Sequence, residues 1–309
     1  MLTDAGIFLL RALAKRSVMC YPHAIKTGKE AFAMPIMRFP LGRPKALTLS
    51  YDDGVEQDIR LMELLDRYQL HCTFNLNSGC YAAEGTRWPE GTIHRRLPRS
   101  RVLPLYANPA HEVAVHCLTH ANLIELPADQ VVYEVMQDRV NLERDFGTII
   151  RGMAYPFGTY NDTVVDALRT CGIQYARTVE SSHAFGIPQD WLRLKPTCHH
   201  ADPMLDQLCD DFLTVSTRFC SRVFYLWGHA YEFEADGNWQ VMEAFCQKMS
   251  GHDDIWYCTN IALCEYVKAF QSLIYAADGS MVRNPSTQSV WIEVSGRIVE
   301  CPAGSTVKL

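Results

Sequence analysis

Short apolar segments alternate with amphipathic segments from Ala46 onward, and the apolar segments have the length and composition of strands. They lie at residues 46–51, 71–77, 111–115, 149–155, 173–179, 192–198, 222–228 and 254–259. Strands that alternate with helices pack in parallel and are joined by right-handed crossovers. Because seven or eight such units are present, the pattern favours a closed α/β barrel over an open sheet.

Most of the connections between these strands have helical periodicity. In residues 55–69 the apolar positions form one broad face, made of Ile59, Leu61, Leu64, Leu65 and Tyr68. Residues 161–172 begin with Asn-Asp and end with Gly, which are typical start and stop signals of a helix. Residues 238–251 predict another amphipathic helix. Its inner face is made of Trp239, Met242 and Phe245.

The two ends of the chain follow other patterns. Residues 34–45 contain three prolines and predict an extended lead-in to the first strand, and residues before Met34 are expected to lie outside the fold. Residues 284–304 alternate around a Ser-Gly pair, which predicts a small β-hairpin appended to the barrel. The resulting division is an N-terminal extension (1–45), a barrel (46–275) and a C-terminal β-hairpin extension (276–309).

The net charge of −6 and the scattered basic residues argue against a nucleic-acid partner, because no basic surface is available to hold a phosphate backbone. No apolar stretch reaches the roughly 20 residues of a membrane span. The apolar run at residues 6–14 is interrupted by Arg11. We therefore expect no signal peptide, no transmembrane helix and no membrane partner.

Twelve cysteines are dispersed along the chain without a CxxC pair. A chain of 309 residues with 48% apolar content can form a packed core without a disulfide framework. Reduced and mostly buried thiols are the better interpretation, and they predict a cytoplasmic location.

Polar residues directly follow four of the predicted strands. In an α/β barrel the C-terminal ends of the strands form one rim, where catalytic residues lie. The groups that follow the strands are Asp52 and Asp53, His116 with His120, residues 156–158, and His229. The segment 79–110, rich in Gly, Pro and Arg, is too long for an ordinary connection and is expected to form a loop near this rim.

Some of these residues have the spacing of metal ligands. Two histidines four apart on one helical turn face the same way, so His116 and His120 could offer nitrogens to one ion. If Asp53 is the third ligand, the cation compensates its charge, and Asp52 can stay ionised as a base. Two simpler interpretations remain open: an HxxxH pair also arises by chance among 11 histidines, and Asp-Asp-Gly before a helix is typical of a cap and turn.

Four motifs occur in a fixed order along the chain: LTLSYDDG (47–54), HEVAVHCLTHANL (111–123), AYPFGTYND (154–162) and FYLWGH (224–229). In this order they resemble the motifs of the polysaccharide deacetylases, the NodB-homology or carbohydrate esterase family 4 proteins, over about residues 46–275. The resemblance implies a distorted (β/α)7 barrel. It also implies metal-dependent removal of an acyl group from an N- or O-acylated carbohydrate or a related amide.

The resemblance implies a role for each matching residue. Asp52 would be the catalytic base, and Asp53, His116 and His120 would bind the metal. His229 would be the acid that protonates the departing amine or alcohol. The implied cofactor is a divalent cation, zinc in the first place, with cobalt, nickel and manganese as alternatives; metal-bound water would be the nucleophile.

The third motif both matches the family and departs from it. Phe157 occupies the position whose backbone N–H helps to bind the oxyanion. The family usually has an arginine that orients the base where this chain has Ala154. Arg177, on the next predicted strand, is the first candidate to replace it, and Arg151 is the second.

Further residues near the motifs are candidates for contact with a substrate. The family's fourth motif is represented only by Asp190 and Trp191, which lie beyond the equivalent strand. A second metal site that includes Cys198 is less favoured than substrate contact by the histidines beside it. The substrate-binding candidates are Tyr155, Pro156, Trp191, His199, His200 and Trp227.

Three functions are compatible with these residues. The first is a metal-dependent deacetylase of a carbohydrate; the second is an amidohydrolase that opens a small or cyclic amide with the same site. The third is a catalytically silent, carbohydrate-binding relative, which the missing arginine favours and the retained aspartates and histidines disfavour. The sequence does not determine the substrate, the native metal or the oligomeric state.

Overall fold

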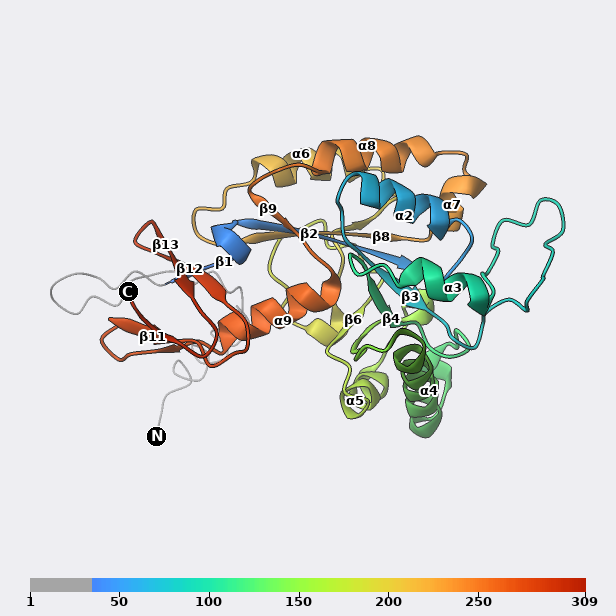
Figure 1. Ribbon diagram of the computed structural model, residues 1–309, viewed down its shortest axis with the longest axis horizontal. Helices are drawn as coiled ribbons and strands as arrows, with labels where there is room; N and C mark the ends of the chain where they lie inside the picture. The colour runs from blue at the N-terminus through green and yellow to red at the C-terminus, as the bar shows by residue number, and fades with distance from the viewer. Residues whose placement is uncertain (1–34) are drawn as a thin grey trace, which may run out of the picture.

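The computed structural model describes residues 35–309 (Figure 1). At its centre a curved sheet of parallel strands has the order β6-β5-β4-β3-β2-β8-β7. The strands are β2 (Lys45–Asp52), β3 (Cys72–Leu76), β4 (Glu112–Val115), β5 (Gly152–Ala154), β6 (Tyr175–Arg177), β7 (Cys198–His199) and β8 (Arg222–Gly228). A further strand, β9 (Ile255–Tyr257), pairs with the first residues of β2. The parallel arrangement predicted from the sequence is confirmed.

Irregular backbone closes this sheet into a barrel between β6 and β8. The amide of Thr178 donates to the carbonyl of Leu194 at 2.9 Å, and the amide of Leu194 donates to the carbonyl of Ala176 at 2.9 Å. On the other side, the Thr197 amide donates to the carbonyl of Tyr225 in β8 at 2.8 Å. The segment that ends in β7 therefore fills the seventh strand position, and the fold is a distorted (β/α)7 barrel.

The strand predicted at residues 192–198 is the least regular part of the barrel. The structure has a 3-10 helix, η4 (Trp191–Arg193), followed by only two residues of strand in β7. Pro196 lacks an amide hydrogen and cannot donate to a neighbouring strand, so the ladder is interrupted there.

Helices cover the outside of the barrel, as the amphipathic segments predict. In Figure 1, α2, α6 and α8 lie along one side of the sheet, and α4 and α5 lie along the other. The helices are α2 (Asp58–Arg67), α3 (Arg99–Tyr106), α4 (Ala128–Phe146), α5 (Asp162–Thr170), α6 (Leu205–Thr214), α7 (Ala230–Ala235), α8 (Trp239–Met249) and α9 (Asn260–Gln271). The side chain of Asn161 caps α5 by accepting a hydrogen bond from the Val164 amide at 2.9 Å. The helix ends before Gly172, which has a φ of 70°.

The C-terminal residues form two small antiparallel sheets at one end of the barrel (Figure 1). The predicted hairpin is present as β12 (Val290–Val294) and β13 (Arg297–Cys301), and its turn residues Ser295 and Gly296 both have a positive φ. The second sheet contains β10 (Ile274–Tyr275), β11 (Met281–Arg283) and β14 (Thr306–Lys308).

The lead-in to the barrel takes part in this C-terminal structure. Its strand β1 (Ile36–Arg38) pairs antiparallel with β12. The buried hydroxyl of Tyr266 in α9 donates to the carbonyl of Arg38 at 2.6 Å and accepts from the Trp291 amide at 2.9 Å. One hydrophobic cluster thus joins α9, the lead-in and the C-terminal sheets.

The segment 79–110 contains α3 and a loop that returns to the end of the barrel. Val55, just after β2, forms an isolated bridge with Arg96 of this loop. Within residues 35–309, none of the helices is both long enough and apolar enough to cross a lipid bilayer. The expectation for residues before Met34 concerns a part of the chain outside these described residues.

Candidate active site

Both aspartates of the first motif lie at the C-terminal end of β2, where they are 2% and 6% exposed for Asp52 and Asp53. Successive side chains of a regular strand point to opposite faces. Asp53 departs from this geometry with a φ of 88°, a backbone conformation that is strained for a residue with a Cβ. The departure lets both carboxylates reach the same imidazole: the Nε2 atom of His116 is 3.8 Å from Asp52 Oδ2 and 3.9 Å from Asp53 Oδ1.

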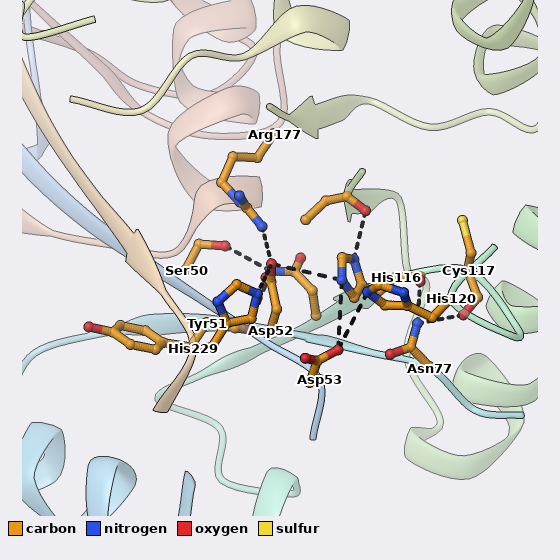
Figure 2. A network of polar contacts seen from close by, with 12 residues as sticks. Ser50, Tyr51, Asp52, Asp53, Asn77, His116, Cys117, His120, Arg177 and His229 are labelled. Atoms are coloured by element: carbon orange, nitrogen blue, oxygen red, sulfur yellow. Dashed lines mark hydrogen bonds and ion pairs between the residues drawn. The ribbon is translucent and has the colours of Figure 1, made fainter. Parts of the chain in front are cut away.

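Asp53, His116 and His120 are brought together as the sequence suggested, with ligand atoms that all lie within 4.8 Å of one another (Figure 2). The Nε2 atom of His120 is 3.7 Å from Asp53 Oδ1. The expectation that the two histidines share a helical turn is wrong, because the residues between them form a turn and loop. Cys117 and His120, with φ values of 64° and 56°, direct the chain so that the two rings converge.

The donor atoms of this group fit a divalent cation. His116 Nδ1 donates to the carbonyl of Ala154 at 2.9 Å, which leaves the Nε2 lone pair free. Burial lowers the pKa of His116 to about 4, so this imidazole is neutral at physiological pH. Ligand atoms about 2 Å from one ion are typically 3 to 4 Å from each other, and Asp53 Oδ1 lies 3.9 Å from His116 Nε2 and 3.7 Å from His120 Nε2. The set of one carboxylate and two imidazoles suits zinc or a similar transition metal.

Residues of the long loop hold Asp53 from the other side. Arg96 Nη2 donates to Asp53 Oδ1 at 2.9 Å, and His94 Nε2 is 3.1 Å from Asp53 Oδ2. Arg96 Nη1 also donates to Asn77 Oδ1 at 2.6 Å, and Asn77 Nδ2 donates to the carbonyls of His116 and Cys117. Burial alone would raise the pKa of Asp53, but His94, His116 and Arg96 hold it below its usual value.

Sequence reasoning missed His94, Arg96 and Asn77. It placed their loop near the rim of the barrel and noted that the loop is rich in arginine, but it treated the basic residues only as scattered charge. His94 is 41 residues from Asp53 along the chain, and Arg96 is 43 residues from it. Periodic patterns in the sequence predict only local structure, so they could not predict these contacts. The available signal was the unusual length of the loop.

Arg177 contacts Asp52, which is the position that the sequence proposed for the replacement of the missing arginine. Its Nη2 donates to Asp52 Oδ2, while Asn75 Nδ2 donates to Asp52 Oδ1 at 2.8 Å. Burial would raise the pKa of Asp52, but Arg177 and then His116 and His229 keep it below its usual value. Arg177 is fully buried, with its guanidinium 4.3 Å from the centre of the Trp227 ring. Arg151 instead donates to the carbonyl of Gly172.

His229 completes the group from the end of β8. Its Nε2 atom is 3.8 Å from Asp52 Oδ2, on the side away from His116 and His120 (Figure 2). Its Nδ1 atom is 3.1 Å from Oε1 of Glu232, in the first turn of α7. Burial would lower the pKa of His229, but Glu232 and then Asp52 raise it above its usual value.

The substrate-binding candidates separate into exposed and buried residues. His199 is partly exposed beside His229, with ring centres 6.4 Å apart. The side chain of Phe157 is 63% exposed, and its ring centre is 4.6 Å from that of His120, so it lies at the mouth of the site. The candidates that are buried are Tyr155, Pro156, Trp191, His200 and Trp227.

These five residues are buried and have partners within the protein, so their contact with a substrate stays a prediction. The hydroxyl of Tyr155 donates to the carbonyl of Leu192 at 2.7 Å inside the core. Trp191 belongs to the hydrophobic cluster that joins α9 and the C-terminal sheets. Trp227 stacks on Arg177, so it supports the site from within rather than from its open face. Hydrophobic side chains with polar tips at strand ends look the same in the sequence whether they line a pocket or pack beneath it.

Comparison with known proteins agrees with the motifs. The family model described as polysaccharide deacetylase matches residues 42–176 of this chain, so this segment is similar to the polysaccharide deacetylases. No curated protein matches the chain in sequence.

Several solved structures are similar in fold. A Mycobacterium smegmatis protein assigned as a polysaccharide deacetylase has a TM-score of 0.53 and 16% identity, over 79% of this chain and 96% of its own. A Streptomyces lividans family 4 carbohydrate esterase has a TM-score of 0.46 and 15% identity, over 69% of this chain and 91% of its own. A CE4 family pseudoenzyme from Bacillus anthracis has a TM-score of 0.45 and 17% identity, over 74% of this chain and 68% of its own. The similarity to the Mycobacterium smegmatis protein supports the barrel fold.

Proposed function

We propose that this protein is a metal-dependent hydrolase that removes an acetyl group from an N- or O-acetylated carbohydrate. The main support for the proposal is that Asp52, Arg177 and His229 lie together. They lie beside the three side chains that could bind a cation, which are those of Asp53, His116 and His120. These side chains come from the ends of separate parallel strands, which is where α/β barrels place catalytic residues.

In the proposed site Asp53, His116 and His120 hold one divalent cation. Bound there, the cation would lower the pKa of water and polarise the acyl oxygen. The chain prepares the ligands by fixing the His116 tautomer through Ala154 and by orienting Asp53 with Arg96.

Asp52 is the proposed general base. It is ionised and buried, and Arg177 and Asn75 occupy one position on each of its two oxygens. These bonds fix the plane of the carboxylate and leave further lone pairs for the proton of an attacking water. The charge of Arg177 keeps the carboxylate ionised between turnovers.

His229 is the proposed general acid, and Phe157 the proposed oxyanion donor. His229 Nε2 lies on the opposite side of Asp52 from His116, so it could protonate the amine or alcohol that departs from the acyl carbon. Phe157 has a φ of 58° between Pro156 and Gly158, and its ring centre lies 4.6 Å from that of His120. A backbone N–H there could stabilise the oxyanion.

Two alternatives use the same residues. An amidohydrolase acting on a small cyclic amide needs the same base, acid and cation. A silent binding relative is less well supported, because Arg177 supplies the contact with Asp52 that the missing arginine would have made.

The test is acetate release combined with metal analysis. N-acetylglucosamine oligomers, acetylated xylan and a cyclic imide or ureide would be assayed with the chelated protein and after addition of Zn²⁺, Co²⁺, Ni²⁺ or Mn²⁺. We expect cation-dependent acetate release from a carbohydrate. Opening of the cyclic amide alone would favour the second function, and binding of the oligomers without turnover of any substrate would favour the third.

A further inference from the structure

Glu232 lies at the centre of a second cluster of histidines, beside the proposed site. Its Oε1 atom is 3.1 Å from His229 Nδ1, and its Oε2 atom is 3.1 Å from Nε2 of both His199 and His200. The carboxylate is thus shared by three imidazoles from two strand ends, β7 and β8. No role for Glu232 follows from the motifs.

The spacing of His199, His229 and Glu232 would also suit a metal ion, since their ligand atoms lie within 4.8 Å of one another. The hydrogen bonds argue against that reading. His199 Nδ1 accepts from the Ala201 amide at 3.1 Å, so in the neutral ring Nε2 must carry the proton. A protonated nitrogen has no lone pair for a cation, and it donates to Glu232 instead.

The same reasoning applies to His200. Its Nδ1 atom is buried without a hydrogen-bond partner, whereas its Nε2 atom faces Glu232. A buried lone pair without a donor costs less than a buried N–H without an acceptor, so the proton is on Nε2. Burial lowers the pKa of His200, which keeps this ring neutral. Both histidines therefore donate to Glu232 and hold its carboxylate in place.

Local geometry aims Glu232 at His229. His229 is the N-cap of α7, and Glu232 is the third residue of that helix, so the two side chains face each other across the capping turn. Gly228 lets His200 approach, because a Cβ at this position would lie 2.0 Å from His200 Nδ1. The cluster is thus built into the backbone at the end of β8.

We infer that Glu232 is the positioning residue of His229: it fixes the ring with a proton on Nδ1 and with Nε2 toward Asp52, and it stabilises the doubly protonated form that a general acid needs. The inference rests on the proposed function for the role of His229 as acid. The pairing itself stands on the distances and tautomers above.

The other groups that face His229 favour the same charge state. Asp52 approaches Nε2 from β2, Tyr231 packs at 5.2 Å between ring centres, and His199 faces the ring from β7. Asp53 adds a weaker negative charge from the same rim. The His229 ring therefore lies between two carboxylates, those of Asp52 and Glu232, and Glu232 is the nearer of the two.

The first experiment is an NMR titration of the full chain with ¹⁵N-labelled histidine, in which His229→Asn assigns the resonance. In the unmodified protein we expect His229 to titrate above pH 6.5 and to keep its proton on Nδ1 at high pH, while His199 keeps its proton on Nε2. In Glu232→Gln the midpoint of His229 should fall by about one pH unit or more. An unchanged midpoint, or an Nε2 proton on His229 at high pH in the unmodified protein, would overturn the inference.

The second experiment is the pH dependence of acetate release. Glu232→Gln should lower kcat with little change in KM, and its alkaline limb should move to lower pH, because the acid loses its proton earlier. Glu232→Asp keeps the negative charge, so its alkaline limb should lie closer to that of the unmodified protein than the limb of Glu232→Gln does. The matched control is Glu234→Gln, which removes a carboxylate of the same helix that is paired with Arg95 outside the site. Absence of acetate release from the unmodified protein would refute the proposed function, while the titration would still decide the pairing.

Discussion

Asp52 and Asp53 are adjacent in the chain but have different surroundings. Asp53 faces two histidines and is held by the long loop, whereas Asp52 faces His229 and the buried Arg177. Both carboxylates also approach Nε2 of His116, at 3.8 and 3.9 Å. Adjacent carboxylates repel, and each is compensated here by its own cationic or hydrogen-bonding partners.

The Asp52→Asn variant tests this division of roles. The amide cannot accept a proton from water, so kcat should fall by roughly 10²–10⁴-fold, the usual contribution of a general base. Metal content, measured by inductively coupled plasma mass spectrometry, should not change.

The matched comparison is His120→Ala, which should lose both metal and activity because it removes a proposed ligand. Near-normal acetate release by Asp52→Asn would show that Asp52 is not the base.

Arg177 offers a second prediction at the residue scale. In Arg177→Met the Asp52 carboxylate is left buried without its main partner, which costs on the order of 3–5 kcal/mol or raises the pKa of Asp52. We expect a lower free energy of unfolding in urea and an acidic limb of the activity profile that moves to higher pH, because the base is now protonated more easily.

Arg169→Met is a suitable control, because Arg169 is paired with Asp166 on the exposed face of α5. If both variants had the same stability and the same pH profile as the unmodified protein, Arg177 would not be the partner that orients the base.

At the scale of elements, the two ends of β4 have different roles. A residue of the proposed active site follows one end, and a residue that contributes to stability begins the other. His116 follows the C-terminal end of β4, while Glu112 begins the strand at the opposite end of the barrel and is partly buried. The Glu112 carboxylate accepts from Thr73 Oγ1, the Tyr175 hydroxyl and the Ile261 amide at 2.8, 2.8 and 2.9 Å. The last of these is in the first turn of α9, so Glu112 links two strands to a helix start.

The pKa of Glu112 predicts a pH-dependent stability. Burial raises this pKa to about 7 from the usual 4.5, because the three hydrogen bonds offset only part of the desolvation. The folded protein therefore binds the proton more tightly than the unfolded chain, and the free energy of unfolding should fall as pH rises from 4.5 to about 7. The total contribution is roughly 3 kcal/mol.

Glu112→Gln should remove this part of the pH dependence, since the amide stays neutral. Urea unfolding at pH 5 and pH 8 measures it, with Glu265→Gln, an exposed carboxylate of α9, as the control. Equal pH slopes for Glu112→Gln and the unmodified protein would contradict the prediction.

At the scale of the whole molecule, the barrel and the C-terminal sheets share one hydrophobic cluster. Strand β1 precedes the barrel but pairs with β12, which follows it. Tyr266 in α9 is bonded to both strands. The C-terminal residues are thus packed against the lead-in and the last barrel helix.

Tyr266→Phe should measure this connection. It leaves the carbonyl of Arg38 and the amide of Trp291 buried without a partner, which costs about 1–3 kcal/mol. Urea unfolding should show that loss. Tyr257→Phe is the control, because the hydroxyl of Tyr257 also donates to a carbonyl, that of Met249, and accepts from an amide, that of His252, but at a half-buried position that water can reach. If both variants lowered the free energy of unfolding by the same small amount, Tyr266 would not be a stabilising link between β1 and β12.

The pattern of apolar and polar residues determined the order of strands and helices, the barrel and the hairpin, because these follow from local periodicity and from which faces must be buried. It also placed the motif residues at strand ends. It could not determine that residues 194–197 close the barrel without a regular strand, or that β1 pairs with β12, because both depend on hydrogen bonds between distant segments.

The tertiary structure alone decided which side chains surround the motif residues. Nothing near Asp53 in the sequence identifies His94 or Arg96, and the three-residue spacing of His229 and Glu232 does not reveal the histidines that share the carboxylate. Burial likewise separated Trp191 and Tyr155, which pack in the core, from Phe157 at the mouth. Local sequence sets which chemistry a residue can perform, but contacts across the fold set its charge, its tautomer and its access to solvent.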